Sequence, residues 1–207
     1  MILGFSHLSL STTNIVESEK NILKQGYQRE FLCSQIPNHP AKLQFLNVFE
    51  PFHDIALYSH KTKPTLELIK HGNSFAPGQG AFEYNDNHVV MHIPSAKSLS
   101  FYVESLNFRK EPEGSILSIK SPIAAWSLKI VIKECLPVRE CSLDSPGCCV
   151  LALWCRNLED RLNLLKRSGV TEYSEPFFVN INGKELKVAL FRSPGGGIFE
   201  LVEFKSR

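Results

Sequence analysis

The stretch Thr65-Leu66-Glu67-Leu68-Ile69 is a short apolar run with a single carboxylate at its centre, and a very similar run, Ile198-Phe199-Glu200-Leu201-Val202, occurs near the end of the chain. Alternation of this kind is typical of a half-buried strand. A carboxylate inside such a strand is unfavourable unless it has a partner, because removing an unpaired charge from water costs several kcal/mol or more. The recurrence therefore predicts a repeated unit that carries a polar site on one face of a sheet.

The segment that leads to the first of these runs has the pattern of a β-α-β-β-β unit. Residues 5–10 alternate with period two, which places His7 on the face of a strand opposite the leucines. Asn14 can cap a helix and Gly26 can end it. Three strands should follow, interrupted by a proline-containing insertion at residues 32–52.

Two further segments repeat this plan. One starts at His88, which aligns with His7 without a gap through the helix and into the second strand. The other ends in the strand with Glu200 but has Val150 at the position of His7. Internal repetition of this kind indicates duplicated structural units. We therefore expect three units, at residues 1–72 (with the insertion 32–52), 87–134 and 148–207, joined by linkers at 73–86 and 135–147.

The composition is that of an ordinary globular protein. Of the 207 residues, 43% are apolar and 21% are charged, and the formal net charge is +2. These values argue against long disorder and against nucleic acid as a partner. No apolar segment is long enough to span a bilayer, so no membrane contact is expected and the cytoplasm is the expected location. The six cysteines are then expected to be reduced, with a zinc site as the alternative.

The chain resembles the vicinal oxygen chelate superfamily, whose members include glyoxalase I, bleomycin-resistance proteins and extradiol dioxygenases. The resemblance rests on a histidine in the first strand of a unit and a glutamate in its last, within Phe5–Leu10, Thr65–Leu68, Asn87–Val90 and Ser193–Leu201. The last stretch is similar to the family's Asp-Pro-x-Gly-x-x-x-Glu ending, with Ser193 in place of the aspartate. The resemblance implies an α+β fold in which repeated β-α-β-β-β units form curved mixed sheets around a cradle.

In that family two units pair, and residues on the concave face of the sheet bind a divalent metal ion. If the first and second units pair, the resemblance implies His7, Glu67 and His88 as metal ligands. If the first and third units pair, it implies His7, Glu67 and Glu200. Lys129 falls near the fourth family position, which is a departure because an ammonium group cannot bind a metal. Such ligands suit iron, zinc, manganese or nickel, and a third unit left without a partner would favour a homodimer.

The resemblance implies a metal-dependent, glyoxalase-like lyase or isomerase that acts on a small-molecule substrate with vicinal oxygens. In such an enzyme the metal stabilises an oxyanion while a nearby carboxylate, Glu67 or Glu200, moves a proton. Two alternatives stay open: an Fe(II)-dependent extradiol-type dioxygenase, and a small-molecule binding protein of the bleomycin-resistance type without catalytic activity. The histidines His53, His60 and His71 are expected at loops or strand ends, in contact with solvent.

Overall fold

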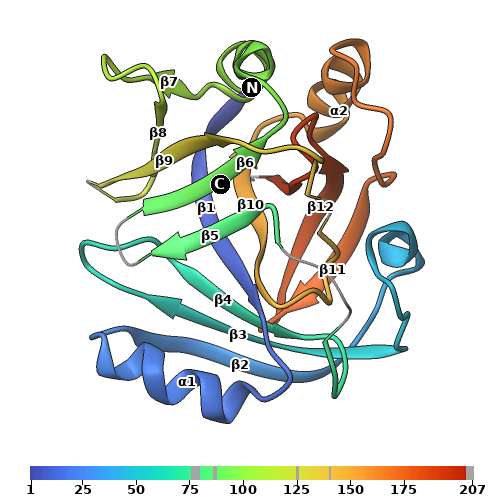
Figure 1. The fold of residues 1–207 in the computed structure, drawn as a ribbon. Coiled ribbons are helices and arrows are strands. Elements are labelled where there is room, and N and C mark those ends of the chain that lie inside the picture. The colour runs from blue at the N-terminus through green and yellow to red at the C-terminus, as the bar shows by residue number, and fades with distance from the viewer. Residues whose placement is uncertain (76–79, 86–87, 125, 140, 204–207) are drawn as a thin grey trace.

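The computed structural model describes residues 1–75, 80–85, 88–124, 126–139 and 141–203. Its strands form two sheets, accompanied by few helices (Figure 1). The first segment contains β1 (Ile2–Ser11), α1 (Ile15–Lys24), β2 (Gln28–Pro37), the 3-10 helix η1 (Pro40–Phe45), β3 (Phe52–Ser59) and β4 (Leu66–Lys70). The second contains β5 (Phe82–Asn85), β6 (His88–Ile93), the helical turns η2 (Ala96–Ser98) and η3 (Phe101–Ser105), β7 (Arg109–Lys110), β8 (Ile116–Lys120) and β9 (Ser127–Glu134). The third contains β10 (Gly147–Cys155), α2 (Leu158–Arg167), β11 (Phe177–Ile181), β12 (Lys184–Arg192) and β13 (Ile198–Glu203).

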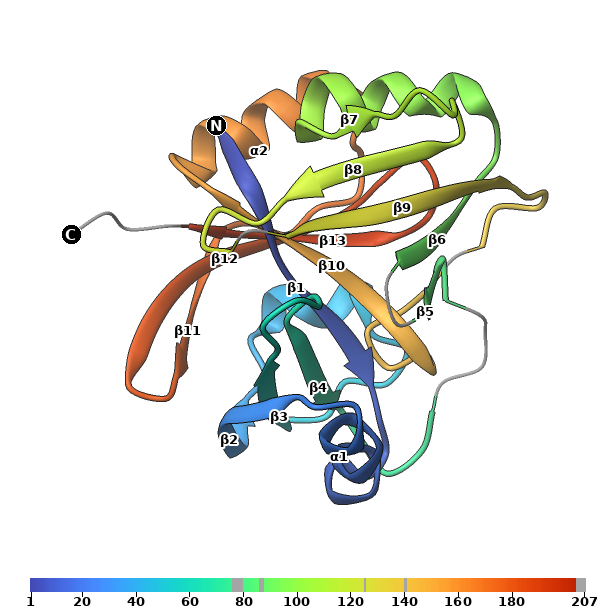
Figure 2. The ribbon, with the colours of Figure 1, turned by 90° about the vertical axis from the view of Figure 1, so that its left-hand side faces the viewer.

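The first and third segments form one curved eight-stranded sheet in the order β11-β12-β13-β10-β1-β4-β3-β2 (Figure 2). Its central contact is the antiparallel pair of β1 and β10. On either side a strand lies parallel to its neighbour, β4 beside β1 and β13 beside β10. The predicted α+β fold with a curved mixed sheet is confirmed. Of the two pairings considered from the sequence, the structure has the one between the first and third segments.

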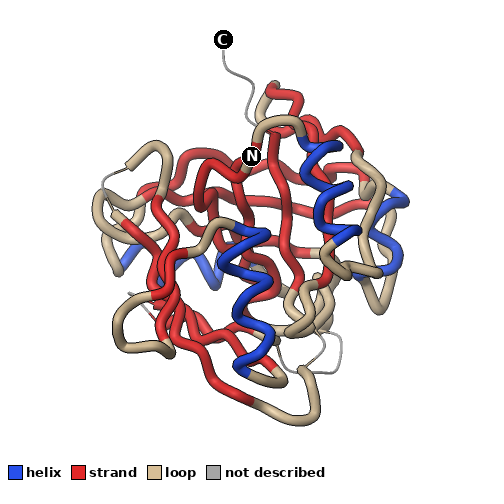
Figure 3. The backbone as a smooth tube through the Cα atoms, turned by 90° about the horizontal axis from the view of Figure 1, so that it is seen from above, coloured by secondary structure: helices blue, strands red, loops and turns tan. Residues whose placement is uncertain are grey.

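The second segment forms a separate five-stranded sheet in the order β5-β6-β9-β8-β7. Its apolar side chains Val89, Met91 and Ile130 belong to the same buried core as Phe5 and Leu8 of β1. Figure 3 shows the strands of the two sheets, the helices and the loops from above. Because the apolar face of the second segment is covered within the chain, the reason for expecting a homodimer no longer applies.

The insertion is shorter than the sequence predicted. β2 continues to Pro37 and pairs with β3, with a bulge between Cys33 and Ile36. Only residues 38–51 leave the sheet, and they include the helix η1. The prolines therefore mark the end of a strand and the start of a 3-10 helix, where a missing amide proton does no harm.

The predicted linker at residues 73–86 contains the strand β5, which pairs with β6. In β5, the ring of Phe82 packs edge to face on Phe199 of β13, with 5.6 Å between the ring centroids. A Cβ atom on Gly197 would lie 2.6 Å from the Phe82 ring. The glycine turn before β13 is therefore explained by this close approach, and it sets where the strand with Glu200 begins.

The insertion is fixed to the loop before β10 by buried and hydrogen-bonded contacts. Phe45 is fully buried, and its carbonyl oxygen accepts a hydrogen bond of 2.8 Å from the amide of Leu143. The carboxylate of Asp144 accepts hydrogen bonds from the amides of Asn47 and Val48, at 3.1 and 3.0 Å. These contacts give the helix η1 a defined position, which matters for the site described below.

Within the described part of the chain, no helix has the length and apolar character needed to cross a bilayer. All six cysteines are free thiols. Burial raises the pKa of Cys155 to about 12, so this thiol stays protonated and unreactive at neutral pH.

Two neighbouring leucines of α2 provide a test of this packing. Leu165 is fully buried against the core, whereas Leu164 is 40% exposed. We expect Leu165→Ala to lower the free energy of unfolding by about 2–5 kcal/mol because it leaves a cavity. Leu164→Ala makes the same change of residue type in the same helix and should cost less than about 1 kcal/mol. Urea unfolding measures both values, and equal losses would contradict the placement of the helix.

Candidate functional site

The concave face of the eight-stranded sheet encloses a cavity of about 450 Å³, which we call the cradle. This volume is in the range of ordinary small-molecule sites. Its lining is mixed, with apolar side chains on the walls and ionisable groups inside. The residues that line it include His7, Phe31, Lys42, His53, Glu67, Trp154, Val188 and Glu200.

Three of the predicted site residues converge in the cradle. Nε2 of His7 lies 3.7 Å from Oε2 of Glu67 and 3.5 Å from Oε2 of Glu200. Strand register explains the convergence: Ser9 of β1 is level with Glu67 of β4, and Ala152 of β10 is level with Glu200 of β13. Because β1 and β10 are adjacent, the two glutamate-bearing strands flank them on both sides.

His7 is held by one ring nitrogen and exposes the other to the carboxylates. Nδ1 lies 3.0 Å from Oγ of Ser6, while the buried Nε2 has no hydrogen-bond partner in the described part of the chain. Burial alone lowers the pKa of His7, but Glu67 and Glu200 outweigh it, so the pKa is raised. His7 therefore holds its proton more tightly than a free histidine when only these side chains surround it.

The two glutamates differ in how firmly they are held. Oγ of Ser9 donates a 2.6 Å hydrogen bond to Oε2 of Glu67. Burial raises the pKa of Glu67, although His7 and Ser9 act in the opposite direction. Among the described residues no side chain fixes Glu200 by a comparable hydrogen bond, and its side chain is 18% exposed against 11% for Glu67. Glu200 is thus the freer of the two carboxylates.

His88, the fourth predicted ligand, is not brought to this group. It lies on β6 of the five-stranded sheet, opposite Asn85 and Lys129. The expected convergence of His7, Glu67 and His88 is wrong because the second segment does not pair with the first. The placement of Lys129 needs correction as well. Because His88 aligns with His7, Val90 of β6 aligns with Ser9 of β1. Ser9 is level with Glu67, whereas Val90 is level with Val131, so Val131 stands at the glutamate position.

Two ionisable residues of the cradle were not predicted. Lys42, from η1, is only 7% exposed, and its Nζ lies 3.3 Å from Nε2 of His53. Burial lowers the pKa of Lys42, while Glu200 and Glu67 oppose that change. A lysine in a proline-containing insertion carries no pattern that indicates burial. The alternation Phe52-His53-Asp54-Ile55 could have indicated that His53 lies on the sheet.

Of the three histidines expected in solvent, His53 and His71 are buried instead, and His60 is half-buried. His53 and His71 are 2% and 3% exposed, and their rings stack with 5.3 Å between centroids. Burial and the charge of Lys42 lower the pKa of His53 to about 3. Its ring is therefore neutral at physiological pH, and Nε2 can accept a hydrogen bond from the Lys42 ammonium.

The three converging side chains have the chemistry that a divalent metal ion requires. One imidazole nitrogen and two carboxylates are ligands for iron, zinc or manganese. Bonds of about 2.1 Å to a tetrahedral ion place neighbouring ligand atoms about 3.4 Å apart, close to the 3.5 and 3.7 Å measured around His7. No group of three or more His, Cys, Asp and Glu side chains among the described residues already has a coordinating geometry. The side chains of His7, Glu67 and Glu200 would therefore turn slightly to hold an ion.

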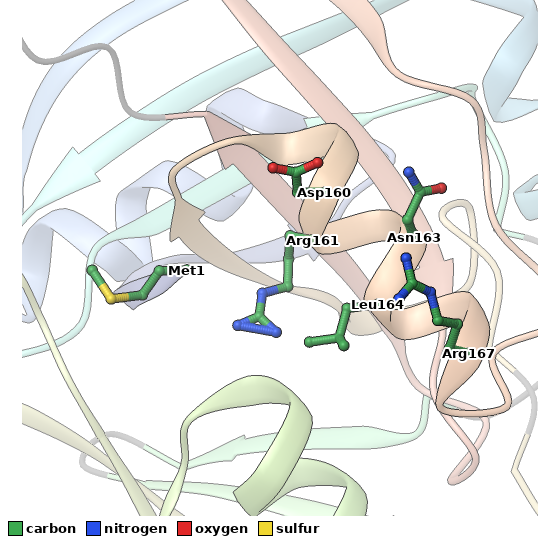
Figure 4. A pocket seen from close by; sticks show the side chains of 6 residues that line it. All are labelled: Met1, Asp160, Arg161, Asn163, Leu164 and Arg167. Carbon is green, nitrogen blue, oxygen red and sulfur yellow. The ribbon is translucent and has the colours of Figure 1, made fainter.

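A second hollow lies outside the cradle, on the outer face of α2. Its volume is about 310 Å³. Figure 4 shows the side chains that line it, which are Met1, Asp160, Arg161, Asn163, Leu164 and Arg167. It shares no residue with the cradle. Its side chains of opposite charge and its open shape are those of an ordinary helix surface.

No protein-family model matches the chain, and no curated protein is similar to it in sequence. Solved structures are similar in fold. Glyoxalase I from Zea mays is 16% identical with a TM-score of 0.40, over 97% of this chain and 67% of that one. A putative dioxygenase from Bacillus subtilis is 11% identical with a TM-score of 0.41, over 98% of this chain and 62% of that one. A glyoxalase family protein from Enterococcus faecalis is 24% identical with a TM-score of 0.40, over 57% and 97%.

The neutral state of His53 predicts a loss of stability in acid. The unfolded chain binds a proton at this ring near pH 6.5, whereas the folded chain does so only near pH 3. This contribution to stability is complete above pH 6.5 and is lost as the pH falls through that window, by up to about 1.4 kcal/mol per pH unit. Urea unfolding of the metal-free protein between pH 7.5 and 5 should show a slope that His53→Asn reduces by about that amount. An unchanged slope in the variant would contradict the assignment.

Proposed function

We propose that this protein is a divalent-metal-dependent enzyme of the lyase or isomerase type, acting on a small organic molecule with two adjacent oxygen atoms. The observation that carries the proposal is the position of Nε2 of His7, buried and without a hydrogen bond among the described residues, between Glu67 and Glu200 in the cradle. A buried nitrogen that makes no hydrogen bond is costly. A bound ion would remove that cost.

The ligand set favours this reaction type over oxygen activation. The Fe(II) oxygenase pattern has two histidines and one carboxylate, whereas the cradle brings together one histidine and two carboxylates. The second carboxylate is the group a proton-transfer reaction needs. His88, which would have supplied the second histidine, lies in the other sheet.

In the proposed reaction, each group of residues in the cradle has a separate role. When bound, the metal would act as a Lewis acid on the substrate oxygens. Glu67, fixed by Ser9, is the stationary ligand. Glu200, the freer carboxylate, removes a proton from the carbon next to the substrate carbonyl and returns it. The apolar walls of the cradle, which include Phe31 and Val188, exclude water from that exchange.

Metal analysis of protein purified without an affinity tag tests the proposal. We expect about one equivalent of Fe(II), Zn(II), Mn(II) or Ni(II) to be bound, and His7→Ala, Glu67→Gln and Glu200→Gln each to weaken affinity more than about 10-fold, since even indirect losses have that effect. His88→Ala is the matched control and should leave the affinity unchanged. Less than about a tenth of an equivalent after addition of all four ions would overturn the proposal.

A second measurement separates catalysis from binding alone. The neutral probe 2-hydroxyacetophenone has two adjacent oxygens and an acidic carbon proton, so the metal-loaded protein should exchange that proton for deuterium in D2O. Glu200→Gln should slow the exchange by about 10²-fold, because it removes the base. If the probe binds but exchanges no faster than in buffer, the protein is a binding module of the bleomycin-resistance type.

A further inference from the structure

Lys42 is a cation placed inside the cradle by a segment that the repeated units do not share. It comes from η1 in the insertion, is 7% exposed, and lines the same cavity as His7, Glu67 and Glu200. Among the described residues, its ammonium donates one hydrogen bond, to the neutral ring of His53 at 3.3 Å. A buried ammonium is expensive unless negative charge compensates it.

The charge balance of the cradle depends on whether a metal is bound. Without metal, the carboxylates of Glu67 and Glu200 are the negative charges that act on the buried Lys42 in the same cavity. A divalent ion held by His7, Glu67 and Glu200 would bring two positive charges to these carboxylates. The ion then neutralises the two glutamates, and Lys42 is left as one uncompensated positive charge. The other charged lining residues, Glu30 and Lys184, are exposed and of opposite sign, so they do not supply the missing charge.

The rest of the lining indicates the remainder of the ligand. Apolar side chains from both halves of the sheet surround the polar floor, among them Phe31 and Ile55 from the first segment and Val179, Leu186 and Val202 from the third. Such walls favour an apolar group of moderate size, because its burial is worth about 25 cal/mol per Å². A ligand that satisfies the whole cradle has one negative charge at one end and an apolar body.

We infer that Lys42 binds the carboxylate of a monoanionic organic substrate, and that the metal-loaded cradle therefore selects a small organic acid with an apolar body. This inference rests on the proposed function and names the substrate class for the same site. Lys42 donates to the carboxylate while the adjacent oxygens of the acid face His7, Glu67 and Glu200.

The test compares two probes of nearly equal shape, mandelate and its neutral amide, mandelamide, by calorimetry on metal-loaded protein. Wild-type protein should bind mandelate about 10-fold or more tightly than mandelamide, as a hydrogen bond between charged groups implies. Lys42→Met and Lys42→Gln should lose that preference. Lys184→Met removes a lysine from the exposed rim of the same cavity and should keep it.

Three results would overturn the inference: equal affinities for the two probes in the wild type, a preference kept in both Lys42 variants, or a preference already present in metal-free protein. The comparison of mandelate with mandelamide on wild-type protein tests the inference even if a Lys42 variant fails to fold. Metal affinity is measured in the same samples, and removal of the repelling ammonium should leave it unchanged or raise it. If the protein binds metal but has equal affinities for the two probes, the proposed function stands and this inference is wrong. If it binds no metal, both are wrong.

Discussion

Because β1 and β10 run antiparallel at the centre of the eight-stranded sheet, each brings its own parallel partner to the same concave face. β4 carries Glu67 and β13 carries Glu200, and His7 of β1 lies between them. No contact inside a single segment could assemble this group. The cradle, its ionisable floor and its apolar walls therefore all depend on one strand pairing between residues more than a hundred positions apart.

That pairing places like charges close together in a buried setting, and the surrounding residues reduce the cost. Ser9 donates to Glu67, and His7 faces both glutamates. Lys42 supplies a further cation from the insertion. Buried ionic groups rarely add net stability. Four such groups in one cavity are therefore explained better by binding than by folding, because ionisable groups of this kind cluster at functional sites.

The sequence predicts those parts of the site that follow from local alternation. The equivalence of Glu67 and Glu200 and the inward direction of His7 come from period-two patterns, and the structure places all three together. The choice of partner segments could not be predicted, since pairing between units is decided by distant contacts that leave no local signal. Lys42 is a harder case still, because its burial depends on how Phe45 and Asp144 fix the insertion to the loop before β10.

The second segment shows why repetition alone does not give function. It has the same order of strands, but register puts Val131 where the other segments have glutamate, and His88 stands opposite Lys129. Its conserved feature is the apolar face, with Val89 and Met91 in the common core. The second segment thus covers the common core, whereas the first and third segments each form half of the cradle. The two halves of the cradle differ in two ways. The third segment has Val150 where the first has His7, and only the first has the insertion, which brings the amino group of Lys42 into the cavity.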